Sequence, residues 1–270
     1  MKCVTTGGAV FIGLNITRHI DEKYFFTSKR RSAAFLVVNF TDTRSLETPG
    51  VSLMVKYSPM TETTLYYITF LRHGESVGNA EDRFQGHADF PLTEQGRAQA
   101  QALARRWQDE GITFDQCIAS PLLRARQTAE IVAGALKIPL EFDPDWMEIN
   151  NGLVAGLTTE QATQVAPRPD FMTPYTHYGK TGESRFELFL RAGRAIQRIL
   201  DRAPGRYLVA SHGGILNMAL YAILGIPVQA DSGGPRFIFD NTSFTTFTYE
   251  PERHCWRMLN FGNRQHWKED

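Results

Sequence analysis

Cysteine is scarce in this sequence, and long apolar runs are absent. The 270 residues include three cysteines, Cys3, Cys117 and Cys255, which lie far apart and form no C-x-x-C pair. This pattern supports neither a zinc site nor a disulfide framework, and it predicts a reducing, cytoplasmic setting. No run of about 18 apolar residues occurs, so we expect no membrane-spanning helix.

The sequence also has no excess of charge of either sign. Its 29 lysines and arginines match 29 aspartates and glutamates. A neutral chain has no global attraction for nucleic acid or for a membrane surface, so we expect neither as a partner. A site for an anion must therefore be a local cluster of positive groups.

Sustained periodicity is missing from the start of the chain. Residues 1–63 contain a basic cluster, an apolar run and a Pro-Gly turn signal, with no helical repeat. We interpret residues 1–63 as an N-terminal extension that is either disordered or the product of a mis-assigned chain start. The candidate starts are Met60 and Met54, and Met60 stands just before a strong strand pattern. The predicted working domain is residues 64–270.

From residue 64 onward, strand and helix patterns alternate. Residues 65–71 (LYYITFL) are typical of a buried strand. Helices are expected at residues 93–109, 121–136, 184–202 and 214–224, further strands at residues 114–119, 206–211, 237–239, 243–249 and 256–260, and a long loop region with short helices at residues 139–182. This alternation predicts an α/β fold, a three-layer α/β/α sandwich with a mostly parallel central sheet.

Charged side chains follow three of the predicted strands. The three segments are Arg72-His73-Gly74-Glu75-Ser76, Ser120-Pro121-Leu122-Leu123-Arg124 and Ser211-His212-Gly213-Gly214. In parallel sheets, ligands bind outside the carboxyl ends of the strands. Two arginines and two histidines are thus expected in one crevice, where they form a local positive cluster suited to a dianionic phosphate.

These segments resemble the signature of the histidine phosphatase superfamily (branch 1), which includes the cofactor-dependent phosphoglycerate mutases. Four blocks follow the order of that family: LRHGES at 71–76, FQG at 84–86 with PLTEQGR at 91–97, SPLLRARQTA at 120–129, and SHGG at 211–214. The resemblance covers about residues 64–267 and leaves out the first 60. It implies the phosphoglycerate mutase-like fold.

The resemblance implies a role for each matching residue. His73 is the expected nucleophile, which forms a phosphohistidine, and Arg72, Arg124 and His212 are expected to hold the phosphoryl oxygens. The further phosphate-binding candidates are Asn79, Gln85, Gly86 and Gly213. A nucleophilic histidine needs one neutral ring nitrogen, so its other nitrogen should donate to a fixed acceptor such as a backbone carbonyl. Fixed cations can stabilise the transition state without a metal, and we expect no cofactor.

A general acid must protonate the leaving oxygen. The family places a glutamate in a segment that residues 146–156 (WMEINNGLVAG) resemble, and Glu148 is therefore the candidate. Ala155 stands where the family has an acidic residue, and this departure weakens any assignment of the substrate. Four other histidines lack the paired spacing of metal ligands. Glu75 is expected to be a helix or loop contact without a catalytic role. The helix residues Arg126, Arg185, Arg191 and Arg194 are expected to be surface charges.

Three functions fit these residues. The predicted one is a phosphomonoester hydrolase that acts through a phosphohistidine on a small phosphorylated metabolite, and the alternatives are a cofactor-dependent phosphoglycerate mutase and a non-catalytic binder of phosphorylated ligands. In the mutases, an insertion with an Arg-Arg pair covers the pocket, whereas residues 158–182 contain only Arg168 and Lys180 as basic residues. A binder would lack the nucleophile or an arginine, and all of them are present. The phosphate ester itself and the formation of a homodimer stay open.

Overall fold

The computed structural model describes residues 2–6, 9–13 and 65–267 of two compact units, Met1–Ser58 and Pro59–Asp270. In the first unit, β1 (Lys2–Thr6) and β2 (Ala9–Gly13) form an antiparallel pair. The rest of the predicted extension, including the chain start considered at Met60, lies outside the described residues. The domain boundary near residue 63 therefore stays a prediction.

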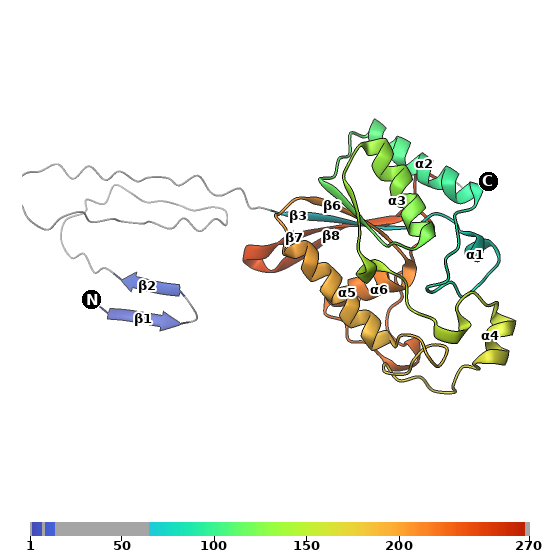
Figure 1. Ribbon diagram of the computed structural model, residues 1–270. Helices are drawn as coiled ribbons and strands as arrows, with labels where there is room; N and C mark the ends of the chain where they lie inside the picture. The colour runs from blue at the N-terminus through green and yellow to red at the C-terminus, as the bar shows by residue number, and fades with distance from the viewer. Residues whose placement is uncertain (1, 7–8, 14–64, 268–270) are drawn as a thin grey trace, which may run out of the picture. The chain divides into compact units, whose positions relative to one another are not determined.

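A six-stranded sheet forms the centre of the second unit, in the order β5-β4-β6-β3-β7-β8 (Figure 1). The strands are β3 (Tyr66–Arg72), β4 (Gln116–Ala119), β5 (Leu140–Phe142), β6 (Arg206–Ser211), β7 (Phe244–Glu250) and β8 (Cys255–Asn263). The β5/β4, β4/β6 and β6/β3 pairs are parallel, whereas β7 is antiparallel to both of its neighbours. The prediction of a mostly parallel sheet is confirmed.

Helices cover both faces of this sheet, which confirms the three-layer sandwich (Figure 1). One face carries α2 (Glu94–Asp109) and α3 (Leu123–Leu136), and the other carries α5 (Arg185–Leu200) and α6 (Gly213–Leu224). The connections contain the short helices α1 (Val77–Ala80) and α4 (Thr159–Val165) and the 3-10 turns Pro144–Trp146, Gly152–Val154, Ala230–Ser232 and Pro251–Arg253.

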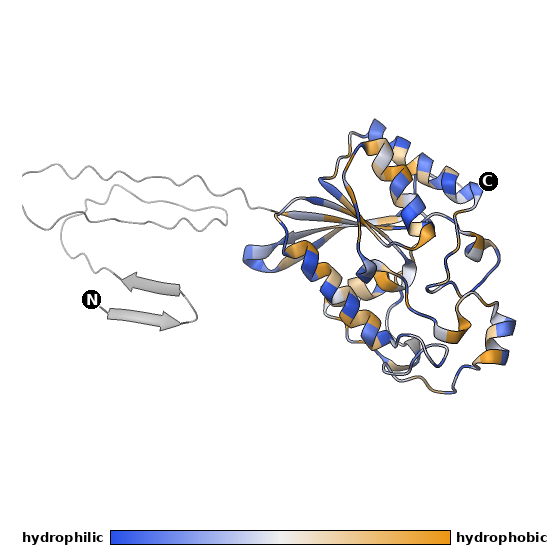
Figure 2. Ribbon diagram, in the orientation of Figure 1, coloured by the Kyte–Doolittle hydropathy of each residue, from blue (hydrophilic) through white to orange (hydrophobic). Residues whose placement is uncertain are grey.

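Alternating side chains of β3 give each face of the sheet its own apolar core. Ile68 and Phe70 pack in the cluster that includes residues of α5 and α6, whereas Leu71 packs in the cluster with residues of α2 and α3. Each such buried side chain stabilises the fold by roughly 1.5–3 kcal/mol. Figure 2 shows hydrophobic and hydrophilic residues interleaved along α2 and α5, as expected for helices that cover a sheet with one side.

Side-chain caps set the beginnings of the main helices. The Thr93 hydroxyl accepts a hydrogen bond from the Gly96 N–H, and α2 begins there as predicted. Ser184 and Glu187 form the expected capping box at the start of α5. These caps support the predicted boundaries of the helices that flank the site.

Two predicted elements differ from the structure. Residues 237–239 were predicted as a strand, but they form no ladder, because the Asn217 side chain binds both the N–H and the carbonyl of Phe237. Conversely, Leu140–Phe142 lies within a predicted loop and forms the edge strand β5. Three residues are too short for apolar periodicity to reveal a strand.

Candidate active site

The carboxyl ends of β3, β4 and β6 meet at one edge of the sheet. Arg72 lies opposite Ser211 in the register, and the His73 N–H donates to the Ser211 carbonyl at 2.9 Å. The ring centroids of His73 and His212 are 5.1 Å apart as a result. Residues that are far apart in the sequence thus form one cluster because the strands are parallel.

The imidazole of His73 is held in a single orientation. The side chain is buried, and its Nδ1 lies 2.7 Å from the Gly74 carbonyl oxygen. Because a carbonyl only accepts, Nδ1 carries the proton and Nε2 has the free lone pair. Burial, together with the charges of Arg124 and Arg72, lowers the pKa of His73 well below 6.5. The ring is therefore neutral at neutral pH, as nucleophilic attack requires.

Backbone carbonyls, and not carboxylates, hold the two arginines of this cluster. Arg72 Nη1 donates to the Phe239 carbonyl at 2.6 Å. Arg124 donates to the carbonyls of Ala88 at 3.0 Å and Gly86 at 2.8 Å. Both Nε atoms are buried and have no hydrogen-bond partner among the described residues. Each guanidinium is thus fixed without being neutralised, and it keeps a donor for an anion.

A serine contacts the second histidine. His212 is fully buried, and its Nε2 lies 2.7 Å from Ser120 Oγ. The same Oγ accepts from the Leu122 N–H at 3.3 Å, and its second lone pair and its hydrogen allow it either to accept from His212 Nε2 or to donate to it. His212 Nδ1 has no hydrogen-bond partner within the described part of the chain. It is a third buried nitrogen without a partner in the cluster that contains His73.

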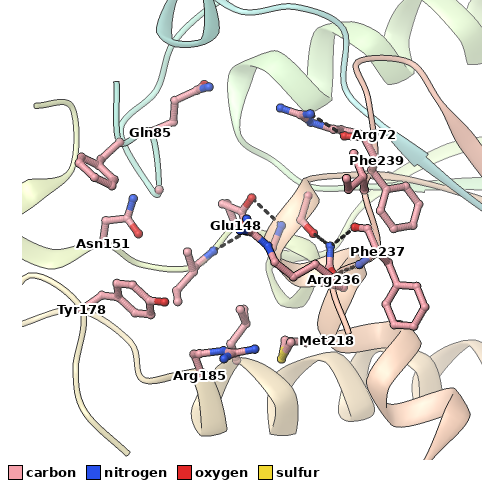
Figure 3. Close-up of a pocket in the computed structure, with 18 of the residues that line it drawn as sticks. Arg72, Gln85, Glu148, Asn151, Tyr178, Arg185, Met218, Arg236, Phe237 and Phe239 are labelled. Atoms are coloured by element: carbon pink, nitrogen blue, oxygen red, sulfur yellow. Dashed lines mark hydrogen bonds between the residues drawn. The ribbon is translucent and has the colours of Figure 1, made fainter. Parts of the chain in front are cut away.

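Glu148 lies at the N-terminus of α6. Its Oε2 accepts from the Gly214 N–H at 3.0 Å, and its Oε1 accepts from the N–H groups of Ile215 at 3.1 Å and Ile149 at 2.9 Å (Figure 3). A Cβ on residue 214 would collide with this carboxylate, so the approach requires glycine. The N-terminus of α6 therefore binds a side chain of the protein itself.

Burial and the charge of Glu148 shift the pKa values of Arg72 and Arg124 in opposite directions. Burial lowers the pKa of Arg72, and it lowers the pKa of Arg124 to about 10, while the negative charge of Glu148 opposes both changes. Both guanidinium groups are therefore charged at neutral pH. The cluster presents fixed positive charge beside a carboxylate, which is the combination that phosphoryl transfer needs.

Arg191 of α5 fixes the segment that carries Glu148. Its guanidinium donates to the carbonyls of Asp145, Met147 and Glu148 at 2.9, 2.6 and 3.0 Å, and to both oxygens of Glu183 at 2.9 and 2.6 Å. The prediction that Arg191 is a surface charge was wrong, because its side chain is 12% exposed. The sequence feature that could have revealed this contact is the acidic Glu183, which stands just before the helix that carries Arg191.

A cavity of about 860 Å³ lies over this edge of the sheet (Figure 3). Of the residues predicted for the site, those that line it are Arg72, His73, Gln85, Gly86, Arg124, Glu148 and Gly213. The lining also includes four arginines that were not predicted for the site: Arg83, Arg168, Arg185 and Arg236. Arg185, predicted as a surface charge, is half-buried here. Two carboxylates, Glu148 and Asp231, face these six arginines.

Asn79 is not among the lining residues. Its Oδ1 accepts from the Ser76 hydroxyl at 2.9 Å and from Asn241 Nδ2 at 3.3 Å, and Asn241 also donates to the His73 carbonyl at 3.0 Å. The Ser76 hydroxyl lies 2.7 Å from Gln85 Oε1 as well. Asn79 thus supports the loop around His73 and does not itself reach the cavity.

Within residues 2–6, 9–13 and 65–267, no group of three or more histidine, cysteine, aspartate or glutamate side chains is arranged to hold a metal ion. No helix in these ranges is long and apolar enough to cross a membrane. The cytoplasmic location stays a prediction.

Comparison with known proteins identifies relatives for this unit. The histidine phosphatase superfamily (branch 1) matches residues 68–263, from within β3 to the end of β8. "Probable phosphoglycerate mutase GpmB" from Escherichia fergusonii is 35% identical over 187 residues, which cover 68% of this chain and 85% of the relative. The structure of Bacillus stearothermophilus YhfR is 30% identical, with a TM-score of 0.65 over 74% of this chain and 98% of the other. A mycobacterial glucosyl-3-phosphoglycerate phosphatase is 25% identical, with a TM-score of 0.59 over 73% and 98%.

Proposed function

Because the chain is an enzyme that belongs to the histidine phosphatase superfamily (branch 1), we propose that it hydrolyses a small phosphomonoester through a phosphohistidine intermediate. One observation carries this proposal. Three buried nitrogen atoms without partners among the described residues, the Nε atoms of Arg72 and Arg124 and Nδ1 of His212, belong to the cluster around the neutral imidazole of His73. Unpaired buried donors are unfavourable, and phosphoryl oxygens would satisfy the two Nε–H groups and, in the tautomer that has its proton on Nδ1, His212 as well.

In the first proposed step, His73 Nε2 attacks the phosphorus atom. The bond between phosphorus and the alcohol oxygen breaks, and the phosphoryl group is carried on the ring. The hydrogen bond from Nδ1 to the Gly74 carbonyl, 2.7 Å long, stabilises the positive charge that the ring acquires. Arg72 and Arg124 bind the equatorial oxygens, where the charge of the transition state is spread.

Glu148 is the proposed general acid and base. It protonates the alcohol oxygen as that oxygen leaves, and it then takes a proton from the water that attacks the phosphohistidine. Phosphate is released and His73 becomes neutral again. The three N–H groups at Glu148 fix the position of the carboxyl group, so the group is already oriented before proton transfer.

Phosphoglycerate mutase is the second candidate function. A relative that is 35% identical bears that name, and the cavity contains arginines beyond the phosphate site. Lys180 is not one of them, because it donates to the Val165 carbonyl at 3.2 Å and does not line this cavity. Hydrolysis remains our proposal because Arg168 and Arg236 at the cavity rim are exposed, and a site that water reaches favours transfer to water.

The test compares release of phosphate with isomerisation of 3-phosphoglycerate. We expect phosphate release to be the faster reaction, and we expect it to be lost in the His73→Ala variant. The matched control is His254→Ala, because His254 is exposed and its side chain, among the described residues, hydrogen-bonds only to the Tyr249 hydroxyl. Faster isomerisation would favour the mutase, and an inactive wild type that still binds phosphate would favour the non-catalytic binder.

A further inference from the structure

Three arginines line the cavity outside the phosphate site. Arg168, Arg185 and Arg236, here called the distal arginines, have no carboxylate partner in the part of the chain that the structure describes. Arg83 is excluded from this group, because its Nε is paired with Glu81 at 2.6 Å. The distal arginines therefore keep positive charge that the protein itself does not neutralise.

Arg236 lies on a segment that is anchored on both sides. Asn217 accepts from the Phe237 N–H at 2.9 Å and donates to the Phe237 carbonyl at 2.6 Å. The Tyr221 hydroxyl donates to the Pro235 carbonyl at 2.8 Å. The backbone that carries Arg236 is thus tied to α6 immediately before and after it. A fixed backbone lowers the entropy cost of binding a ligand with this side chain.

Arg185 approaches the cavity from a different element. It is the first residue of α5, and its one hydrogen bond, to the Gln229 carbonyl, is 3.4 Å long. Its other donors therefore have no partner among the described residues. In the view of Figure 3, Arg185 lies on one side of Glu148 and Arg72 lies on the other. Arg185 thus enters the cavity away from Arg72.

The acidic residues of the cavity do not compensate for this charge. Asp231 is the one carboxylate of the lining besides Glu148, and it accepts from the Met172 N–H at 2.7 Å. The whole chain has no net charge, so six arginines facing two carboxylates are a local excess. Uncompensated like charges repel one another and favour the binding of an anion.

We propose that the distal arginines bind a second anionic group, a carboxylate or a phosphate, on the alcohol part of the substrate. This inference rests on the proposed hydrolysis of a phosphomonoester at His73. The planar guanidinium group matches the oxygens of either anion. Leu188 and Met218 also line the cavity, and they would contact the carbon chain between the two charged groups.

Matched pairs of esters test this proposal. One series consists of unbranched hydroxy acids of two, four and six carbons, phosphorylated on the hydroxyl, and its partner series carries a carboxamide in place of the carboxylate. A third series, the bisphosphates of the corresponding diols, distinguishes a phosphate from a carboxylate. For the wild type we expect kcat/KM for the acid or the bisphosphate to exceed that for the amide by about tenfold or more at one chain length.

Variants of the distal arginines complete the test. Arg185→Gln and Arg236→Gln should each lower this ratio about tenfold, while Arg185→Lys should retain part of it. Arg105→Gln, on the exposed side of α2, is the matched control. Equal rates for charged and uncharged esters, or a ratio that survives both Gln substitutions, would refute the inference while hydrolysis of the amides still supports the proposed function. A wild type that hydrolyses no ester would refute the proposed function itself.

Discussion

Replacement of Arg191 by methionine tests whether this arginine positions Glu148, the proposed general acid. Methionine keeps an apolar stem but removes five hydrogen bonds, and it leaves the Glu183 carboxylate, 14% exposed, without its cation. Removing one partner of a buried ion pair costs about 3–5 kcal/mol. Because this pair is not wholly buried, we expect the free energy of unfolding to fall by about 3 kcal/mol.

The same substitution should also slow catalysis. The Glu148 carbonyl would retain the bond from His87 Nε2, 2.8 Å long, but the carbonyls of Asp145 and Met147 would lose their bonds to Arg191. A shift of the catalytic carboxyl by about 1 Å reduces kcat on the order of 10²-fold. The double variant with Glu183→Gln should recover part of the stability, because it removes the unpaired carboxylate.

Urea unfolding and steady-state kinetics measure these two effects. Arg194→Met, on the same helix, is the matched control: its side chain is 55% exposed, and Asp145 keeps its ion pair with Arg198 at 2.9 Å. Because Arg194 is exposed and the buried Asp145 keeps a second cation, Arg198, the control should lose less stability than Arg191→Met, about 1 kcal/mol. Equal stability losses in the two variants, with kcat unchanged in both, would refute the positioning role of Arg191.

Three further predictions concern the phosphate site. Burial first, and then Arg124, lower the pKa of His73 and His212 well below 6.5, so the unfolded chain binds protons that the native chain does not. The free energy of unfolding should therefore fall as the pH drops below about 6.5, by up to about 1.4 kcal/mol per pH unit for each histidine. Urea unfolding at several pH values measures this dependence, and His212→Asn should make it less steep. Arg124→Lys should lower kcat/KM on the order of 10²-fold, and a loss below about threefold would contradict its role. Gly214→Ala should displace Glu148 and lower kcat more than it raises KM; unchanged kcat would argue against Glu148 as the acid.

The core of the site could be predicted from the sequence because it depends on strand order. Arg72, His73 and His212 directly follow or end apolar strands, and parallel strands deliver their carboxyl ends to one edge. The same rule led to Ser120 and Arg124 after β4. Local sequence and a simple topological rule were sufficient for these residues.

The distal part of the site depends on tertiary contacts that no local pattern reveals. The apolar triplet at residues 237–239 alternates like a strand, with Ile238 70% exposed and Phe239 3% exposed, yet Asn217 takes the backbone partners that a ladder would need. Arg185 and Arg191 lie on the same helix and both looked solvent-exposed, because the segments that they meet come from other parts of the chain. Contacts with those segments decide which charged residues of α5 are buried.

Trapping of the covalent intermediate tests the central claim most directly. A phosphomonoester with a radiolabelled phosphoryl group is mixed with the enzyme, the reaction is stopped in alkaline denaturant, and the labelled peptide is identified. We predict that the label is on His73, that it is absent from His73→Ala, and that it is retained in the His254→Ala control. Label that persists in His73→Ala, or that is found on another residue of the wild type, would contradict the account.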